Sequence, residues 1–271
     1  MMTPDTDRVG ESPPSGAAAR DRTSSDLPKI VIVSDIHGNL EALRALPTGY
    51  DELWVLGDLV NYGPQPAEVV DFVREKASLV VRGNHDDALG FDRDPRCSVM
   101  FRRYAEEVQR YTASVLNKEQ KKYLADLPLF LKTQRAAWSF YLCHAIPSDP
   151  LYAYCSASSK TWPNECNEAG TDFLCVGHTH VQFFRQEGNR VVVNPGSIGQ
   201  SKSGSPRATY AAWEGGSVVL HSYAYPVERT VERLRTMPVP REVQDFLIGV
   251  LETGVVPKSS TETVHVKNQG A

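Results

Sequence analysis

Residues 29–81 alternate short apolar runs with amphipathic segments, and this alternation constrains the fold more than any other feature of the sequence. The apolar runs at 29–34, 53–56 and 79–81 are short and bounded by polar or turn residues, so we expect buried strands. Between them, residues 39–46 and 66–76 carry apolar side chains at helical spacing. This strand–helix order predicts a parallel sheet covered by helices.

The rest of the chain adds a helical insert and more strands. Apolar side chains at helical spacing over residues 96–127 predict two helices, which form an insert at about 88–127. Further strands are expected at 138–143, 173–176, 181–185, 190–193, 209–213 and 218–223. Several of them follow each other through short Gly turns, so we expect a meander that forms a second sheet near the first. Closing helices are expected at 227–234 and 242–251.

Composition narrows the class of protein. We expect one folded body at 29–254 between disordered tails at 1–28 and 255–271, because the tails have few large apolar side chains. No apolar run approaches the roughly 18 to 20 residues of a membrane helix. Lys+Arg is 29 against 33 Asp+Glu, a net charge of -4, which argues against nucleic acid as a partner. The five cysteines include no C-x-x-C pair, and no apolar run precedes Leu27, so we expect no secretory signal and free thiols in the cytoplasm.

Histidine, aspartate and asparagine side chains gather where predicted strands give way to loops. Five of the seven histidines occupy such positions, in the segments Asp35-Ile-His37-Gly-Asn39, Gly57-Asp58, Gly83-Asn84-His85-Asp86, Cys143-His144 and Gly177-His178-Thr-His180. Each segment alone has an ordinary interpretation, such as a turn or a helix cap. Together they are costly to bury unless they satisfy one another or coordinate cations. Open α/β sheets place their ligands at this edge.

This series of segments resembles the calcineurin-like metallophosphoesterase superfamily, in particular its small single-domain bacterial and archaeal phosphodiesterase-type members. The family pattern is Asp-x-His, Gly-Asp, Gly-Asn-His-Asp/Glu, a lone His and Gly-His-x-His, and all five blocks occur here in that order. The resemblance covers roughly residues 29–225, and residues 194–200 also look like a segment that small members carry. It implies an α/β (α+β) fold, a four-layer αββα sandwich of two mixed β-sheets flanked by helices.

The resemblance also implies two divalent transition-metal ions, with Mn first and Fe, Ni, Co or Zn as alternatives. It assigns one metal to Asp35, His37 and His180, the other to Asn84, His144 and His178, and a bridging role to Asp58. Nitrogen and oxygen ligands without thiolate suit such metals better than Ca or Mg. The implied reaction is in-line attack on phosphorus by a hydroxide that bridges the metals.

Three further residues receive roles. The resemblance leaves His85 without a metal, so it would protonate the leaving alkoxide or position the phosphoryl group. We expect Asp86 to accept a hydrogen bond from His85 and fix its tautomer, although Asp86 also fits a helix N-cap and the two roles are compatible. Asn39 fits substrate contact and helix capping equally well.

The substrate is inferred from departures from the family pattern. Protein Ser/Thr phosphatases of the superfamily carry Gly-Asp-x-x-Asp-Arg-Gly and Gly-Asn-His-Glu, whereas Asn61, Tyr62 and Asp86 occupy the corresponding positions here. This argues against a phosphoprotein phosphatase. A dianionic monoester gains more from the missing Arg than a diester does, so we expect a small phosphodiester.

Three alternatives to hydrolysis of a small phosphodiester remain. They are a phosphomonoesterase acting on nucleotides or other small metabolites, a DNA nuclease of the same superfamily, and a non-catalytic scaffold. The acidic balance of the chain disfavours the nuclease, and the complete set of presumed ligands together with His85 argues against the scaffold.

Ala145 stands where small members often have Gly, and it would crowd the metal if its φ had to be positive. The oligomeric state is left open.

Overall fold

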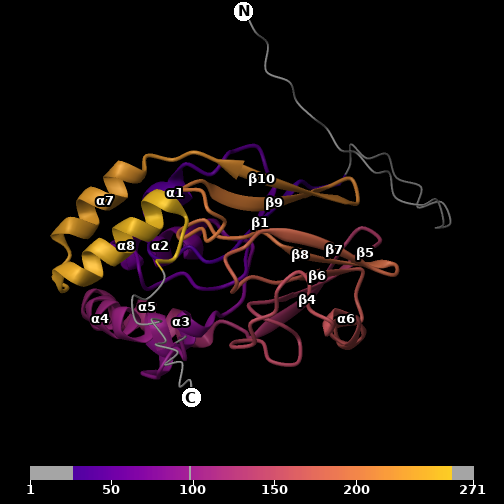
Figure 1. Cartoon of the computed structure of the whole chain (residues 1–271). Helices are drawn as coiled ribbons and strands as arrows, with labels where there is room; N and C mark the ends of the chain where they lie inside the picture. The colour runs from indigo at the N-terminus through magenta and orange to yellow at the C-terminus, as the bar shows by residue number, and fades with distance from the viewer. Residues whose placement is uncertain (1–26, 98, 258–271) are drawn as a thin grey trace, which may run out of the picture.

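The computed structural model describes residues 27–97 and 99–257, so nearly all of both predicted tails lies outside the described residues. Ten strands form two five-stranded sheets (Figure 1). The first has the order β10-β9-β1-β2-β3, formed by β1 (Ile30–Val33), β2 (Glu52–Val55), β3 (Leu79–Val80), β9 (Ala208–Glu214) and β10 (Ser217–Tyr223). The second has the order β4-β5-β6-β8-β7, formed by β4 (Phe130–Arg135), β5 (Trp138–Cys143), β6 (Phe173–Cys175), β7 (Phe183–Glu187) and β8 (Arg190–Asn194).

Both sheets are mixed, as the resemblance implied. In the first sheet β1, β2 and β3 are parallel, and β9 runs antiparallel to β1 and to β10. In the second sheet β5, β6 and β8 are parallel, with β4 and β7 antiparallel at the two edges. The parallel strands at the centre of each sheet therefore end along one edge, which is where a ligand site forms in such folds.

Eight helices surround the sheets in the described part of the chain (Figure 1). They are α1 (Leu40–Arg44), α2 (Pro66–Lys76), α3 (Asn84–Phe91), α4 (Val99–Val115), α5 (Lys118–Asp126), α6 (Trp162–Ala169), α7 (Val227–Thr236) and α8 (Arg241–Thr253). Within residues 27–97 and 99–257, no helix has both the length and the apolar character needed to cross a bilayer.

Strand β1 shows how one sequence serves two faces of a sheet. Ile30 and Ile32 belong to the apolar layer between the two sheets, whereas Val31 and Val33 belong to the layer under α1 and α2. This alternation is the period of two that any strand imposes on its side chains. All four side chains are buried, so the run is continuously apolar. The result is the four-layer α/β sandwich that the resemblance implied.

Aromatic side chains fill the layer between the sheets. The ring of Phe140 on β5 lies 5.0 Å from Trp54 on β2 and 5.4 Å from Trp213 on β9, both edge to face. Edge-to-face contacts of this kind add to the free energy gained by burial. Since Trp54 and Trp213 belong to one sheet and Phe140 to the other, these contacts fix how the sheets stack.

The structure corrects the expected meander. Strands β7 and β8 pair in the second sheet, but β9 and β10 form a hairpin that joins the first sheet beside β1. The sequence pattern did not predict three further elements, namely β4, α3 and α6. Because α3 begins at Asn84, the helical region starts before the expected boundary at residue 88.

Candidate metal centre and active site

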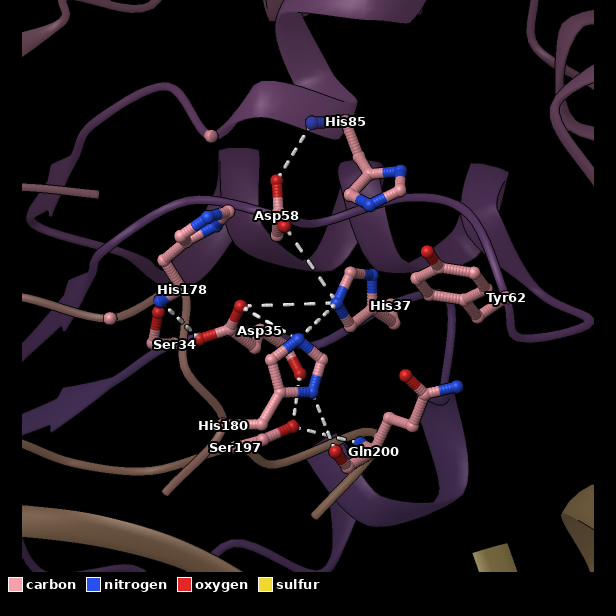
Figure 2. Close-up of polar contacts among 12 residues, drawn as sticks. Ser34, Asp35, His37, Asp58, Tyr62, His85, His178, His180, Ser197 and Gln200 are labelled. Carbon is pink, nitrogen blue, oxygen red and sulfur yellow. Dashed lines mark hydrogen bonds and ion pairs between the residues drawn. The ribbon is translucent and has the colours of Figure 1, made fainter. Parts of the chain in front are cut away.

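The residues predicted as metal ligands come from the ends of five strands. Asp35 and His37 follow β1, Asp58 follows β2, and Asn84 is the first residue of α3, just after β3. From the second sheet, His144 follows β5 directly, and the segment 177–180 follows β6. The structure brings the carboxylates and imidazoles of this set into two adjacent groups. Figure 2 shows the first group together with Asp58 and His178.

The first group consists of Asp35, His37 and His180, whose ligand atoms lie within 4.8 Å of one another. The Nε2 atoms of His37 and His180 are 3.2 Å apart. Oδ1 of Asp35 lies 3.3 Å from Nε2 of His180 and 3.9 Å from Nε2 of His37. This oxygen is buried and has no hydrogen-bond partner among the described residues.

The second group consists of Asp58, His144 and His178, with Asn84 beside it. Nε2 of His144 is 3.3 Å from Oδ2 of Asp58, 3.1 Å from Nδ1 of His178 and 3.1 Å from Oδ1 of Asn84. The Asn84 amide donates from Nδ2 to the carbonyl of Pro95 at 2.7 Å, so its oxygen turns towards His144.

Asp58 connects the two groups. Its Oδ2 lies 3.7 Å from Nε2 of His37 and 3.3 Å from Nε2 of His144, one ring from each group. Its Oδ1 accepts a hydrogen bond of 2.9 Å from the backbone N–H of His85. This is the position that a carboxylate needs to serve both groups.

Backbone carbonyls orient three of the four histidine rings. In each ring Nδ1 donates to a carbonyl, so Nε2 points into the site and carries the lone pair whenever the ring is neutral. The pairs are His37 with Val60 at 3.0 Å, His144 with Leu56 at 2.7 Å, and His180 with Gln200 at 2.6 Å. Two facing lone pairs repel, as at the Nε2 atoms of His37 and His180, and a cation between them removes that repulsion. The donor set therefore fits a metal ion.

Burial shifts the pKa values of the first group. Burial lowers the pKa of His37 to about 4, and it lowers the pKa of His180 well below its usual value. Burial also raises the pKa of Asp35 to about 6, with the Asp58 charge contributing. Neutral imidazoles beside a carboxylate oxygen without a hydrogen-bond partner are the state in which these groups act as ligands.

The second group holds an ion pair. Burial disfavours the charge on His144, but Asp58 outweighs that effect and raises the pKa of His144 to about 9. Burial likewise disfavours the Asp58 carboxylate, but His144 and His85 outweigh it, so the pKa of Asp58 is well below its usual value. Burial lowers the pKa of His178 to about 3. A metal ion at this group would replace the proton on His144.

The backbone around the site is strained. Positive φ is uncommon outside glycine, and strain of this kind concentrates at functional sites. Seven non-glycine residues of the site have positive φ, namely Asp35, His37, Asp58, Asn61, Tyr62, His178 and His180. Ala145 is not among the positive-φ residues of the described chain, so the concern about Ala in place of Gly does not apply.

His85 is held by Asn61 and not by Asp86, which corrects the expected hydrogen bond. The Asn61 amide donates from Nδ2 to Nδ1 of His85 at 2.8 Å. The Asp86 carboxylate instead accepts from the backbone N–H groups of Gly83, Asp58 and Leu59 at 3.0, 2.8 and 2.8 Å. As the third residue of α3, Asp86 caps the helix and holds the loop that carries Asp58.

Asn39 is a helix cap in the structure. Its Oδ1 accepts from the backbone N–H of Ala42 at 3.2 Å and from the hydroxyl of Thr230 at 2.9 Å. Its Nδ2 donates to the carbonyl of Gly199 at 3.0 Å and to the hydroxyl of Tyr225 at 3.1 Å. Both hydrogens and both lone pairs of the amide are therefore used, and the expected substrate contact is not favoured.

Four residues at the site were not assigned a role from the sequence. Tyr62 stacks edge to face on His37 and His85, each at 4.8 Å between ring centroids. The Cys97 sulfur lies 3.5 Å from Nε2 of His85 and 3.3 Å from the Tyr62 hydroxyl. The ring of Tyr154 lies 6.0 Å from that of His178. Lys202 follows the segment 194–200, whose likeness to small family members was the one signal that pointed to it.

Comparison with known proteins agrees with this geometry. A family model for the calcineurin-like phosphoesterase superfamily domain matches residues 29–215. Uncharacterized protein MJ0912 of Methanocaldococcus jannaschii is 31% identical over 209 residues, which are 68% of this chain and 82% of that protein. The crystal structure of a metallophosphoesterase from Sphaerobacter thermophilus superposes with a TM-score of 0.73 at 30% identity, covering 85% of this chain and 100% of that one.

A shorter match has a named activity. The symmetrical bis(5'-nucleosyl)-tetraphosphatase of Thioalkalivibrio sulfidiphilus is 42% identical over 65 residues, which are 21% of this chain and 24% of that enzyme. The family model covers more than half of the chain, and the superposed metallophosphoesterase has the same fold. The chain belongs to the calcineurin-like phosphoesterase superfamily and is a metal-dependent phosphoester hydrolase.

Proposed function

We propose that this protein hydrolyses a small phosphodiester with two divalent transition-metal ions, for which Mn is the first candidate. The observation that carries the proposal is the pair of ligand groups that share Asp58, since its Oδ2 lies within 3.7 Å of His37 and 3.3 Å of His144. Asp35, His37 and His180 would hold one ion, and Asn84, His144 and His178 the other, with Asp58 between them. When bound, such ions supply Lewis acidity towards water and the phosphoryl oxygens.

His85 contributes a hydrogen-bond donor at the edge of the site. Because Asn61 donates to Nδ1, the ring proton of neutral His85 is on Nε2. Burial lowers the pKa of His85 to about 3, so the ring is neutral near pH 7. We propose that Nε2–H binds a phosphoryl oxygen or the leaving oxygen, which positions the ester and stabilises charge that develops on it.

The second candidate function is hydrolysis of a nucleotide or another small phosphomonoester. Tyr154 supports a nucleotide, because the residue is 65% exposed and its ring lies 6.0 Å from that of His178. An exposed aromatic face beside a phosphate site offers a base a surface on which to stack. The match to a bis(5'-nucleosyl)-tetraphosphatase adds dinucleoside polyphosphates to the compounds worth testing.

Metal analysis followed by a hydrolysis screen tests the proposal. The full chain should contain about two metal equivalents, and with Mn it should hydrolyse bis-p-nitrophenyl phosphate faster than p-nitrophenyl phosphate. The screen continues with cyclic nucleotides, nucleoside monophosphates and dinucleoside polyphosphates. Full activity in excess EDTA would overturn the metal-dependent reaction. Metal binding without turnover of any ester would identify the protein as a scaffold.

We also propose a reducing, cytoplasmic setting. All five cysteines are free thiols, and four of them are buried. Cys143 and Cys175 lie on the neighbouring strands β5 and β6 without forming a disulfide.

A further inference from the structure

The ring of Tyr62 packs against two histidine rings of the site. It lies edge to face on His37, a residue of the first ligand group, and on His85, each at 4.8 Å between ring centroids. The rings of His37 and His85 also meet edge to face, at 5.2 Å. Figure 2 shows the three rings lying together. Because edge-to-face contacts between rings are favourable and directional, each ring restrains the other two.

The backbone on both sides of Tyr62 is held against the same two histidines. On one side, the Asn61 amide donates to Nδ1 of His85 at 2.8 Å. On the other side, Gly63 packs so closely that a Cβ there would lie 2.1 Å from the carbonyl oxygen of His37. The segment that carries the Tyr62 ring is therefore fixed to the site and cannot shift without disturbing it.

The Tyr62 side chain also belongs to the apolar core of the helical layer. It is 5% exposed and packs in a cluster built mostly from α4, α7 and α8. Leu247 and Leu251 of α8 line the same small cavity as Tyr62 and His37. Protein Ser/Thr phosphatases of the superfamily carry an Arg at the position of Tyr62, whereas this chain has an aromatic ring that joins the site to the helices.

Helix α8 lies outside the part of the chain that defines the family. Both α7 and α8 follow residues 29–215, which the family model matches. Phe246 of α8 stacks on Tyr104 of α4 at 3.9 Å between ring centroids, and Figure 1 shows α8 beside α7. At Tyr62, an element that the family model does not include therefore meets the rings of the metal site.

We propose that Tyr62 is a positioning residue through which α8 holds the rings of His37 and His85 in place. This inference rests on the proposed function, in which His37 binds a metal ion and His85 binds the ester. Tyr62 acts by fixing these two rings and contacts neither the ions nor the substrate. Because a displacement of about 1 Å can lower a rate 10²-fold, the packing of α8 governs turnover at a site that the helix does not enter.

Two substitutions separate the Tyr62 ring from its hydroxyl. Tyr62→Phe loses only the hydroxyl, which lies 3.3 Å from the Cys97 sulfur, and should retain most of the metal affinity and kcat. Tyr62→Leu stays apolar but loses both ring contacts, so kcat for bis-p-nitrophenyl phosphate should fall about tenfold or more. In Mn²⁺ calorimetry, Tyr62→Leu should weaken one of the two sites and spare the other, because His37 belongs to the first ligand group alone.

A pair of leucines tests whether α8 acts through Tyr62. Leu247→Ala opens the packing at the cavity beside Tyr62, whereas the control Leu234→Ala truncates a similarly buried leucine of α7 that belongs to the same cluster and does not line that cavity. Both should lower the melting temperature. Leu247→Ala should also shift or broaden the NMR signals of the His37 and His85 rings in the metal-free protein and lower kcat, and Leu234→Ala should do neither.

The double variant completes the test. In the Tyr62→Leu background, Leu247→Ala should lower kcat little further, because the ring through which it acts is gone. If this double variant does not fold, Leu247→Val replaces Leu247→Ala in the same comparison.

Three results would each overturn the role of Tyr62. They are Tyr62→Leu matching Tyr62→Phe in metal affinity and kcat, Leu234→Ala disturbing the histidine signals as much as Leu247→Ala, and losses that simply add in the double variant. A wild type that binds metal but hydrolyses no ester would instead overturn the proposed function. The metal affinities and the NMR signals would then still decide the role of Tyr62.

Discussion

The Asn61 amide nitrogen lies 2.8 Å from Nδ1 of His85, and this contact determines which ring nitrogen carries the proton. With the amide as donor, Nδ1 is the acceptor and Nε2 holds the hydrogen, 3.5 Å from the Cys97 sulfur. The Asn61 oxygen is buried without a hydrogen-bond partner in the described residues. If the amide turned round, that oxygen would accept from an Nδ1–H, so Asn61 suits either protonation state of His85.

Asn61→Asp should raise the pKa of His85 above its value of about 3. A carboxylate can only accept from Nδ1–H, and its charge favours the imidazolium. The measurement is an NMR titration of the His85 ring in the metal-free protein. Asn189→Asp, in the exposed turn between β7 and β8, is the control and should leave the titration unchanged. An unchanged His85 pKa in Asn61→Asp would show that the contact does not govern the ring.

His85→Ala should lower kcat by about 10²-fold, the usual size of a lost transition-state hydrogen bond, with both metals retained. Since neutral His85 donates a hydrogen bond without giving up its proton, the loss should be similar for a nitrophenyl and an alkyl ester of the same phosphate. The comparison of kcat for the two esters is the measurement. A loss at least tenfold larger for the alkyl ester, whose leaving group needs a proton, would assign general-acid catalysis to His85.

The sequence determined the central strands but not the partners of every strand. All four side chains of β1 are buried, so the strand appears in the sequence as a continuous apolar run that predicts it. The same holds for most of β2. Strand β4 escaped because it is an edge strand with alternating exposure, and its polar side chains resemble a loop. The β9–β10 hairpin was assigned to the wrong sheet because the local pattern does not show that β9 pairs with β1, more than 170 residues earlier.

The motif residues came together because the ends of parallel strands share one edge. Short polar residues at helix starts were harder to interpret. Asp86 and Asn39 both satisfy backbone N–H groups, and neither the spacing nor the motif distinguishes that role from contact with His85 or substrate. Cys97 reaches the site only through tertiary packing, which leaves no local signal in the sequence.

Asp86→Asn should reduce the free energy of unfolding by about 1–3 kcal/mol, the cost of leaving a buried donor unsatisfied. The carboxylate accepts three backbone N–H groups, and an amide would place an NH2 against at least one of them. Urea unfolding measures the change, with Asp92→Asn as control, since Asp92 is the exposed left-handed C-cap of α3 and Asn suits that conformation. Unchanged stability combined with a leaving-group-dependent kcat would restore the role first expected for Asp86.

Asp58→Asn should lower the metal content from about two equivalents to fewer than one, because its carboxylate adjoins both ligand groups. Asn84→Ala removes an oxygen from the second group alone and should lower the content by about one equivalent at most. Elemental analysis after dialysis measures both, with the exposed Asp71→Asn of α2 as control. Equal metal loss in Asp58→Asn and Asn84→Ala would contradict the shared position of Asp58.

Metal binding should release protons, and His144 is the main source. Asp58 raises the pKa of His144 to about 9 against the effect of burial, so at pH 7.5 the metal-free protein carries a proton on this ring. A metal-bound imidazole is neutral at that nitrogen, so the proton must leave, and metal affinity should rise with pH until about 9. Asp35, with a pKa raised to about 6 by burial, is already ionised at pH 7.5 and adds little.

Calorimetry of Zn²⁺ binding in two buffers with different ionisation enthalpies gives the number of protons released. At pH 7.5 we expect His144 to contribute about one proton per protein, and none at pH 10, where His144 is already neutral. In His144→Gln the proton should disappear together with the affinity of the second group, while the first group still binds. Release that does not vary between pH 7.5 and pH 10 would mean that His144 is neutral before the metal arrives. The Asp58–His144 contact at 3.3 Å would then be an ordinary hydrogen bond with no charge on the ring.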